Sequence, residues 1–441
     1  MSCRLLIEKG VFTSRAALLK DDILDRFLLE NNARPSLVGE IRLGRVAAHL
    51  NGIDAAIISL GDGLDGFLRA QDWPGPKSDT PFSQKLTEGS LLPVQVTKDP
   101  IDDKPYQVTG YVTLENEYVI LKPKSDRIQF AKAFKDPAQK AAIETMLTSH
   151  TAGLTLRSKA ATLTPEDLLP HIQKLEAEWQ KIEDLSGAMQ KAGVLRTSAS
   201  FKDRVSKKWG ARAEEIVIAP PAASPLFASE GIDHEVKDLT ETRIDLTGGG
   251  FLTIEPTEAL VAIDVNSAGS DTWAAKGAPQ QQVNEVAAVE ISRQLRLRNL
   301  SGMILIDVAG IQSKTEAGSL VEILRRETKS DDAHVEILGP SQLGLMQLTR
   351  QRTSAPLHHI LKSPVAGPDT PSLQRLMDLE DSILDAVSHW KTRLVKLNTG
   401  ARLGRYLKEA NALTVIYECH QIQLDLTVVD SMTKDQFQID L

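Results

Sequence analysis

The sequence is poor in cysteine and has no long apolar run. Only two cysteines, Cys3 and Cys419, occur in 441 residues, and neither belongs to a C-x-x-C pair, which argues against a disulfide framework and a thiolate zinc site. No segment approaches the roughly 18 uninterrupted apolar residues of a transmembrane helix. The first residues, MSCRLLIEKG, place charges where a signal peptide would be apolar. We therefore expect no membrane segment and a cytoplasmic location.

The chain also lacks an excess of basic charge and has few aromatic residues. Its formal net charge of −8 argues against a protein that coats nucleic acid through a general positive field. A local basic groove stays compatible with that charge. Aromatics make up 5% of the residues, so any stacking platforms for bases must be few. A chain of this length exceeds the size of one hydrophobic core, so we expect several domains.

The N-terminal third of the chain has the pattern of β-structure. Residues 3–30 alternate short apolar stretches with charged ones, which predicts two or three strands. From residue 39 onward, short apolar runs are separated by turns at Asn51-Gly52 and at 61–63. Closely spaced strands with such turns are typical of a small barrel, which a further strand pair would complete near residue 122.

A helical pattern follows over residues 123–194. An apolar stripe recurs there at steps of three and four residues, with Pro165 in position for the first turn of the helix. The Pro-rich and Ser-rich stretches 219–231 and 363–372 are typical of surface connections. The stripe consists of Leu168, Leu169, Ile172, Leu175, Trp179, Ile182 and Leu185.

Two apolar runs each end in an aspartate. Residues 259–267 read ALVAIDVNS and residues 303–310 read MILIDVAG, with a good helical sequence between them. A strand, a helix and a strand of this length predict a crossover in which the two strands are parallel neighbours. Asp264 and Asp307 would then emerge at the same carboxyl edge of the sheet, where ligands bind in such folds.

Two neighbouring carboxylates need a proton or a divalent cation between them. Mg²⁺ suits them, because it prefers oxygen ligands and is held by one or two carboxylates together with substrate phosphates. Asn266 would project to the same side as Asp264 and could orient a water or a phosphate. This arrangement predicts phosphodiester hydrolysis by metal-activated water. An Asp at a strand end also commonly caps a helix or forms a turn, and the spacing alone supports both interpretations about equally.

The same residues resemble the ribonuclease E/G family of bacterial endoribonucleases. The similar phrases are TEALVAIDVNS (257–267), EISRQLRLRNLSG (290–302), LIDV (305–308) and LGLMQLTRQR (343–352). The likeness is strongest over 250–352, continues weakly toward the N-terminus and is poor after 353. It implies Mg²⁺-dependent cleavage of single-stranded RNA in RNA processing or decay, with Asp264 and Asp307 binding the metal and Asn266 supporting them.

The resemblance also implies an α/β multidomain fold, with RNase-H-like and DNase-I-like catalytic subdomains and an inserted OB-fold RNA-binding barrel. The RNase-H-like subdomain would comprise residues 1–38 and a second part at 195–255. This second part is reduced, because the stretch 187–225 is shorter than in the family. The other implied regions are the OB fold at 39–122, a helical 5′-end-sensing region at 123–194, the DNase-I-like subdomain at 256–362, and a linker with a small C-terminal domain at 363–441.

Several residues match RNA-binding positions of the family. Phe67 would stack on a base. By the burial preference of phenylalanine alone, a core position is about equally supported. Ile57 stands where the family has a second aromatic residue. Arg157 and Ser158 match a pocket for a 5′-monophosphate, where a guanidinium beside a hydroxyl suits phosphate oxygens. From charge rather than from the resemblance, the basic side chains expected to contact RNA or to lie near the metal edge are Lys104, Arg350 and Arg352, and Arg293, Arg296 and Arg298 on the crossover helix. Charge clusters on helices are, however, more often solvated faces.

Besides the shorter stretch 187–225, two departures from the family keep other functions open. Gly310 stands where the family has a further Asp, and HHILKSPVAGPDTPS (358–372) replaces the C-x-x-C zinc link between subunits. We therefore expect no zinc, and either a monomer or a dimer formed through residues 373–441. A non-catalytic RNA-binding protein on the same scaffold is the main alternative. A phosphoesterase for small molecules is a third, disfavoured by the barrel-like segment.

Overall fold

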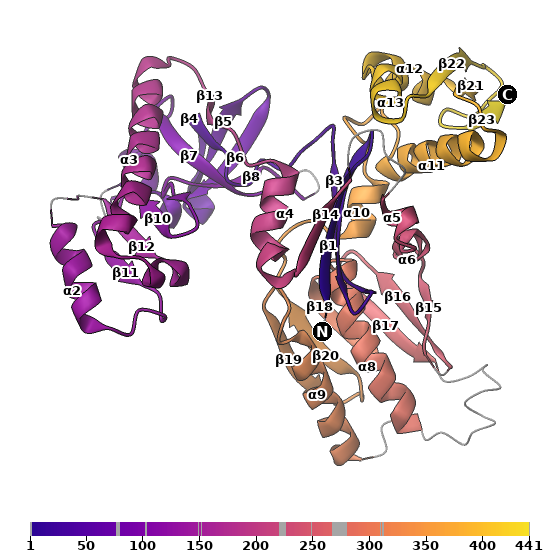
Figure 1. The fold of residues 1–441 in the computed structure, drawn as a ribbon, viewed down its shortest axis with the longest axis horizontal. Coiled ribbons are helices and arrows are strands. Elements are labelled where there is room, and N and C mark those ends of the chain that lie inside the picture. Colours follow the sequence, from indigo (N-terminus) through magenta and orange to yellow (C-terminus); the bar gives the residue numbers. More distant parts are fainter. Residues whose placement is uncertain are drawn as a thin grey trace. The chain divides into compact units, whose positions relative to one another are not determined.

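The computed structural model describes residues 2–75, 80–101, 104–148, 150, 152–219, 226–247, 249–266, 280–308, 310 and 313–440. The chain divides into two compact units. Unit 1 consists of residues 1–35 and 200–441, and unit 2 consists of the intervening residues 36–199 (Figure 1). Unit 2 is therefore an insertion into the sequence of unit 1.

Unit 1 begins with a four-stranded sheet. Strands β1 (Cys3–Lys9), β2 (Thr13–Lys20) and β3 (Ile23–Asn31) form an antiparallel meander, and β14 (Glu215–Ile218) pairs with β1 in parallel. Helix α4 (Phe201–Trp209) buries Phe201, Val205 and Trp209 against one face of this sheet. The strands expected within residues 3–30 are thus confirmed.

Unit 2 contains a closed five-stranded barrel, which is consistent with an OB fold. Its strands follow the order β4 (Ile41–Leu50), β5 (Ala55–Gly61), β6 (Leu64–Arg69), β8 (Tyr106–Thr109) and β7 (Leu91–Lys98), and β7 pairs with β4 to close it. At Gly44 a Cβ would lie 2.3 Å from the Ile58 side chain, so the packed interior accepts only glycine there.

The barrel ends earlier than the sequence suggested. The strands near residue 122, β9 (Leu114–Glu115) and β10 (Val119–Lys122), belong to a separate four-stranded sheet with β11 (Ile128–Phe130) and β12 (Gly153–Leu156). Their apolar side chains, including Leu114 and Leu121, form a second core with α3 rather than filling the barrel. The alternating pattern predicts strands but does not say which sheet they join.

Helix α3 (Pro165–Ala188) confirms the predicted helix and its start, although Leu185 at the end of the expected stripe is exposed. The Thr164 side chain caps the helix by accepting a hydrogen bond from the Asp167 backbone N–H, and Pro165 occupies the first turn. Leu168, Ile172, Leu175 and Ile182 are buried against the four-stranded sheet of unit 2. The unit also contains α1 (Phe82–Lys85), α2 (Pro137–Met146) and β13 (Gly193–Arg196), the last paired with β4.

The predicted crossover lies in a six-stranded sheet of unit 1. Its strand order is β15 (Arg243–Asp245), β16 (Phe251–Pro256), β17 (Leu260–Asn266), β18 (Gly302–Asp307), β20 (Met346–Arg350) and β19 (Val335–Pro340). Strands β17 and β18 are parallel, joined through α8 (Gln280–Leu297), as expected. Helices α8 and α9 (Lys314–Thr328) bury apolar side chains against one face of this sheet.

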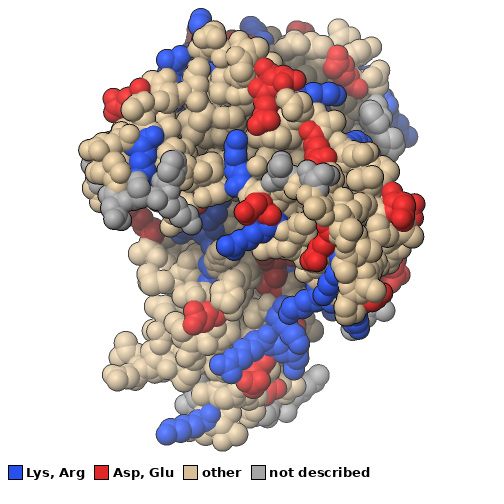
Figure 2. Space-filling view, turned by 90° about the vertical axis from the view of Figure 1, so that its left-hand side faces the viewer, with Lys and Arg blue, Asp and Glu red and all other residues tan. Residues whose placement is uncertain are grey.

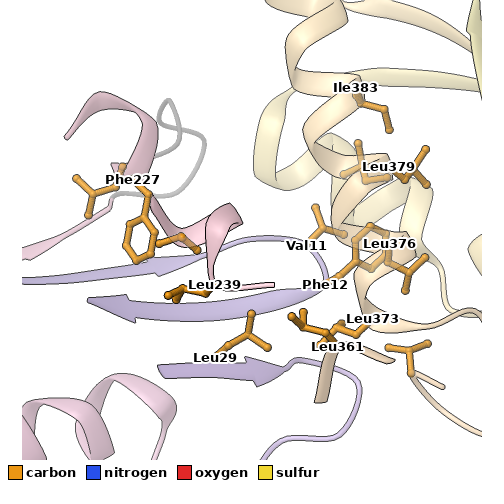
Figure 3. Close-up of a cluster of buried hydrophobic side chains, with 14 of the residues drawn as sticks. Val11, Phe12, Leu29, Phe227, Leu239, Leu361, Leu373, Leu376, Leu379 and Ile383 are labelled. Carbon is orange, nitrogen blue, oxygen red and sulfur yellow. The ribbon is translucent and has the colours of Figure 1, made fainter. Parts of the chain in front are cut away.

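The C-terminal part of unit 1 packs directly on its N-terminal strands. Leu373, Leu376 and Leu379 of α11 (Leu373–Trp390) share a core with Val11 and Phe12, at the turn between β1 and β2 (Figure 3). The remaining elements are α5 (Leu226–Ser229), α6 (Asp233–Asp238), α10 (Leu357–Lys362), β21 (Leu394–Thr399), α12 (Ala401–Glu409), α13 (Ala412–His420), β22 (Gln423–Val428) and β23 (Phe437–Asp440).

The two stretches expected to be surface connections differ from each other. Residues 220–225 of the first lie outside the described residues. In the second, Val365 is fully buried and a β-bridge joins Pro364 to Ser372. This stretch therefore contributes to the core between α10 and α11, although its composition is typical of a loop.

Candidate active site

The predicted acidic pair is brought together by the parallel strands β17 and β18. Asp264 and Asp307 are direct partners in the register, which places their Cα atoms about 4.8 Å apart. Both side chains are exposed, whereas Ile263, Val265 and Ile306 are buried under the helices. Because side chains alternate between the two faces of a strand, both carboxylates lie on the face opposite α8 and α9. We call this the open face of the six-stranded sheet.

Asn266 contacts the acidic pair directly. Its Nδ2 donates a hydrogen bond of 2.8 Å to Oδ2 of Asp264. The two residues are separated by one position in β17 and therefore project to the same side. A carboxylate that accepts this bond is restricted in its rotation, so Asn266 orients Asp264.

The neighbouring strands place an aromatic residue and a cation beside these groups. Thr253 of β16 is the partner of Asp264, and Arg243 of β15 is the partner of Thr253. Phe251 is the partner of Asn266. The guanidinium carbon of Arg243 lies 3.8 Å from the centre of the Phe251 ring. The sequence pattern did not single out Arg243 or Phe251. The period of two along residues 251–256 was nevertheless enough to place Phe251 on the face opposite Leu252 and Ile254.

The donor set fits a magnesium ion that keeps part of its water shell. Two exposed carboxylates on adjacent strands can supply two oxygen ligands, and Mg²⁺ completes its octahedron with waters and substrate phosphates. Over the described parts of the chain, no group of three or more His, Cys, Asp or Glu side chains is placed to hold a metal. Two carboxylates leave the other coordination positions of such an ion to waters and substrate oxygens.

The arginines of the crossover helix do not lie near this edge. Arg293, Arg296 and Arg298 occupy the end of α8 that leads into β18, whereas the acidic pair lies where β17 and β18 end. Arg293 binds Glu290 and Glu235, and Arg296 binds Asp25. Burial lowers the pKa of Arg298 to about 10. These side chains join α8 to the rest of unit 1, which corrects the expectation that they lie by the metal.

Arg350 also lies at the opposite end of the sheet. It is the partner of Gly302, the first residue of β18, and is only 5% exposed. Its guanidinium makes two hydrogen bonds to Asp331, of 3.0 and 2.9 Å, and binds Asn299 and the Leu300 carbonyl. The geometry favours a structural role for Arg350. Arg352, two residues further, is exposed.

Phe67 lies on the outside of the barrel. It pairs with Ile57 across β5 and β6, both side chains are half-buried, and neither belongs to the barrel core. Phe67 lines a hollow of about 190 Å³ together with Arg69, Thr97, Gln107 and other polar residues. Its ring is therefore available to a ligand, unlike a core phenylalanine. Lys104 is exposed in the loop that precedes β8.

Arg157 has an acidic partner. Its Nη2 donates to Oε2 of Glu115 at 2.7 Å, and its Nη1 donates to the carbonyl of Asn116 at 3.0 Å. Ser158 is exposed and begins a short 3₁₀ turn, Ser158–Thr162. A phosphate at Arg157 would have to compete with the Glu115 carboxylate, so the pocket differs from a simple pair of phosphate donors.

The distribution of charge agrees with the acidic composition. Figure 2 shows Lys and Arg side chains gathered in the lower part of the face it presents, with Asp and Glu side chains beside them and elsewhere on that face. An acidic net charge is therefore compatible with a local group of basic side chains. Where the structure is described, no helix has the length and apolar character to cross a membrane.

Comparisons with known proteins find one family of relatives for this chain. Residues 204–353 match the model of the Ribonuclease E/G family. The chain is 27% identical over 382 residues to Ribonuclease E of Nostoc sp., covering 78% of this chain and 55% of that protein. It is 28% identical over 380 residues to Ribonuclease E of Synechocystis sp., covering 78% and 56%.

A third relative is Ribonuclease G of Escherichia coli, which is 25% identical over 401 residues, with 82% of each chain covered. The chain therefore spans just over half of the length of the two ribonuclease E relatives and most of the ribonuclease G. Its family match includes both strands that carry the acidic pair. The chain is thus similar to proteins of the ribonuclease E/G family, to the family model over residues 204–353 and to these three relatives over most of its own length.

Proposed function

We propose that the protein is an endoribonuclease that hydrolyses phosphodiester bonds in single-stranded RNA with the help of Mg²⁺, in RNA processing or decay in the cytoplasm. The observation that carries this proposal is the register pairing of Asp264 with Asp307, with Asn266 bound to Asp264. The family match over residues 204–353 supports RNA as the substrate.

Each residue of the site has a distinct role in this proposal. Asp264 and Asp307 would hold the cation, which supplies an activated water and neutralises charge on the phosphate. Asn266 keeps the Asp264 carboxylate in one orientation, so that less freedom is lost when substrate binds.

The other parts of the chain would hold the RNA. In this proposal the barrel is an OB-fold domain whose Phe67 stacks on a base. Lys104, in the loop before β8, would contact phosphate; Gln107 of β8 is the register partner of Phe67. Arg157 and Ser158 would receive a 5′-monophosphate after Arg157 releases Glu115, and Arg352 would contact the backbone. The six-stranded sheet would be the DNase-I-like subdomain, and the sheet of β1, β2, β3 and β14 the RNase-H-like one.

The proposal is tested with a 5′-monophosphorylated, AU-rich oligonucleotide labelled at its 3′ end. We expect internal cleavage that requires Mg²⁺ and stops in EDTA. Asp264→Asn and Asp307→Asn should each lower the cleavage rate by about 100-fold or more, since each removes a metal ligand. Asp425→Asn, at an exposed Asp on a strand of the C-terminal sheet, should leave the rate unchanged. Full activity of Asp264→Asn would refute the proposed site.

A non-catalytic RNA-binding protein is the second candidate. It is favoured by the small donor set, because Gly310 carries no side chain to add to the two carboxylates. This candidate predicts tight binding of the same oligonucleotide without Mg²⁺ and no cleavage at any Mg²⁺ concentration. Gel-shift and cleavage assays on one sample separate the two candidates.

A further inference from the structure

Phe251 and Arg243 form a stacked pair beside the acidic residues. The guanidinium carbon of Arg243 lies over the Phe251 ring, 3.8 Å from its centre. Nε and Nη2 of Arg243 both donate to Oδ1 of Asp245 at 3.0 Å, which fixes the plane of the guanidinium. The Arg243 side chain is nevertheless 61% exposed. The pair thus presents a flat, cationic surface to solvent.

The stacked pair shares the open face with the proposed metal ligands. In one row of the register, Arg243, Thr253, Asp264 and Asp307 follow one another across four strands. In the next row, Phe251 is the direct partner of Asn266. Neighbouring strands lie about 4.8 Å apart, so Phe251 and Arg243 lie one and two strands away from the acidic pair. This separation is comparable to the size of one nucleotide.

Among the described residues, packing does not account for a phenylalanine at this position. Phe251 is half-buried and does not belong to the core of the six-stranded sheet, whereas its neighbours Leu252 and Ile254 do. Another arginine lies over a phenylalanine between α11 and β23 of the C-terminal sheet, where the guanidinium carbon of Arg375 is 4.2 Å from the centre of the Phe437 ring. Phe437, in contrast, packs against an apolar core. The two pairs have similar geometry but different surroundings.

We propose that the Phe251–Arg243 pair is the stacking platform for the nucleobase next to the scissile phosphate, and so selects which bond is brought to Asp264 and Asp307. Guanidinium planes and aromatic rings both stack on unpaired bases. The Arg243 charge would also attract the adjoining phosphate. This inference rests on the proposed endoribonuclease function, because it assigns a binding position within the same site.

The test is a scan with a set of oligonucleotides that each contain one abasic residue. The abasic residue occupies, in turn, each of the three positions on either side of the cleavage site. With the unaltered protein, we expect an abasic residue at one position next to the cleaved bond to lower the cleavage rate about 5- to 100-fold, which is the range for loss of one stacked base. Phe251→Leu and Arg243→Gln should each lower the cleavage rate on intact RNA by a similar factor. With these variants, the abasic residue at that position should lower the rate hardly any further. Arg375→Gln is the matched control and should keep the full dependence on that base.

Several outcomes would overturn the platform. One is a scan in which the abasic position lowers the cleavage rate of Phe251→Leu and Arg243→Gln as much as it lowers that of the unaltered protein. The substitution and the missing base would then act independently, so the side chains would not contact that base. Complete rescue by Arg243→Lys is another, because a lysine keeps the charge without the flat surface and so indicates a phosphate contact only. Phe251→Tyr should retain activity, and a thermal melt of each variant excludes unfolding as the cause.

A second readout separates this inference from the proposed function. Binding of the intact and abasic oligonucleotides to the Asp264→Asn variant is measured in EDTA by fluorescence anisotropy. If the unaltered protein does not cleave RNA, the proposed function fails, but the platform still predicts weaker binding at one abasic position. That difference should vanish when Arg243→Gln is added. Equal binding of all oligonucleotides by the Asp264→Asn protein would refute the platform by itself.

Discussion

Asn266 illustrates how one hydrogen bond can matter to a two-carboxylate site. Its amide is bound to Oδ2 of Asp264, so its removal should let that carboxylate rotate without removing a charge. We expect Asn266→Ala to lower kcat about 10- to 100-fold, the usual effect of losing a group that orients a metal ligand. KM for RNA should change little. Steady-state cleavage kinetics measure both, and a loss as large as that of Asp264→Asn would instead make Asn266 a metal ligand.

Arg350 should matter for stability rather than for RNA. Its substitution by alanine leaves the Asp331 carboxylate, whose side chain is fully buried, without its cationic partner. Breaking such a buried pair costs about 3–5 kcal/mol of the free energy of unfolding, which urea denaturation measures. Arg352→Ala is the control: its side chain is exposed, so stability should stay within about 0.5 kcal/mol while RNA binding weakens. A stable Arg350→Ala protein that has lost RNA binding would reverse these assignments.

Among the elements, α4 is attached to the turn before β19 through one carboxylate. Asp332 accepts a hydrogen bond of 2.8 Å from Nε1 of Trp209 and lies 2.7 Å from Nη2 of Arg212. Burial by itself would raise the pKa of Asp332. The Trp209 hydrogen bond and the charges of Arg26, Lys208 and Arg212 outweigh burial and hold that pKa below its ordinary value.

This contact should make stability depend on pH at the acidic end. A carboxyl whose pKa is lower in the folded protein stabilises it at pH values above the unfolded pKa of about 4. The contribution is lost as pH falls through the still lower folded pKa. Asp332→Asn should therefore lower the free energy of unfolding by about 1–3 kcal/mol at pH 7. Below about pH 4, the free energies of unfolding of the two proteins should differ less. Urea denaturation of both proteins from pH 7 to 3 checks this, and a constant difference would contradict it.

At the scale of the whole molecule, unit 2 begins and ends at neighbouring points. Ser198 donates from Oγ to the Ser36 carbonyl at 3.1 Å, and Arg196 pairs with Ile41. Unit 2 also has two apolar cores of its own. These features predict that residues 36–199 fold when produced separately. They also predict that a short Gly-Ser linker in their place leaves unit 1 folded.

Calorimetry and RNA binding of the two separate proteins would check this prediction. Each should unfold cooperatively, and residues 36–199 should bind single-stranded RNA through the surface that includes Phe67. Phe67→Ala in this fragment should weaken binding about 5- to 100-fold, the effect of one lost stacking contact. A fragment that shows no cooperative transition would mean that unit 2 depends on unit 1 for its fold.

Much of the site could be predicted because its determinants are local. The apolar runs in residues 259–267 and 303–308 predict two strands, and the intervening helix makes them parallel neighbours. The end of each run places Asp264 and Asp307 at one edge of the sheet. The stripe of α3 and its start at Pro165 are equally local. In each case, the period of buried side chains along a few consecutive residues contains the necessary information.

Only the tertiary structure decided what depends on contacts between distant residues. The sequence alone did not show that the barrel ends at β8, that α11 packs on Val11 and Phe12, or that Arg350 serves Asp331. It also did not reveal the stack of Arg243 on Phe251, since each side chain by itself has an ordinary strand position. The physical reason is that sheet membership, strand order and the partner of a long arginine side chain follow from register and packing across the chain. The acidic pair was thus determined by the sequence, and its surroundings by the fold.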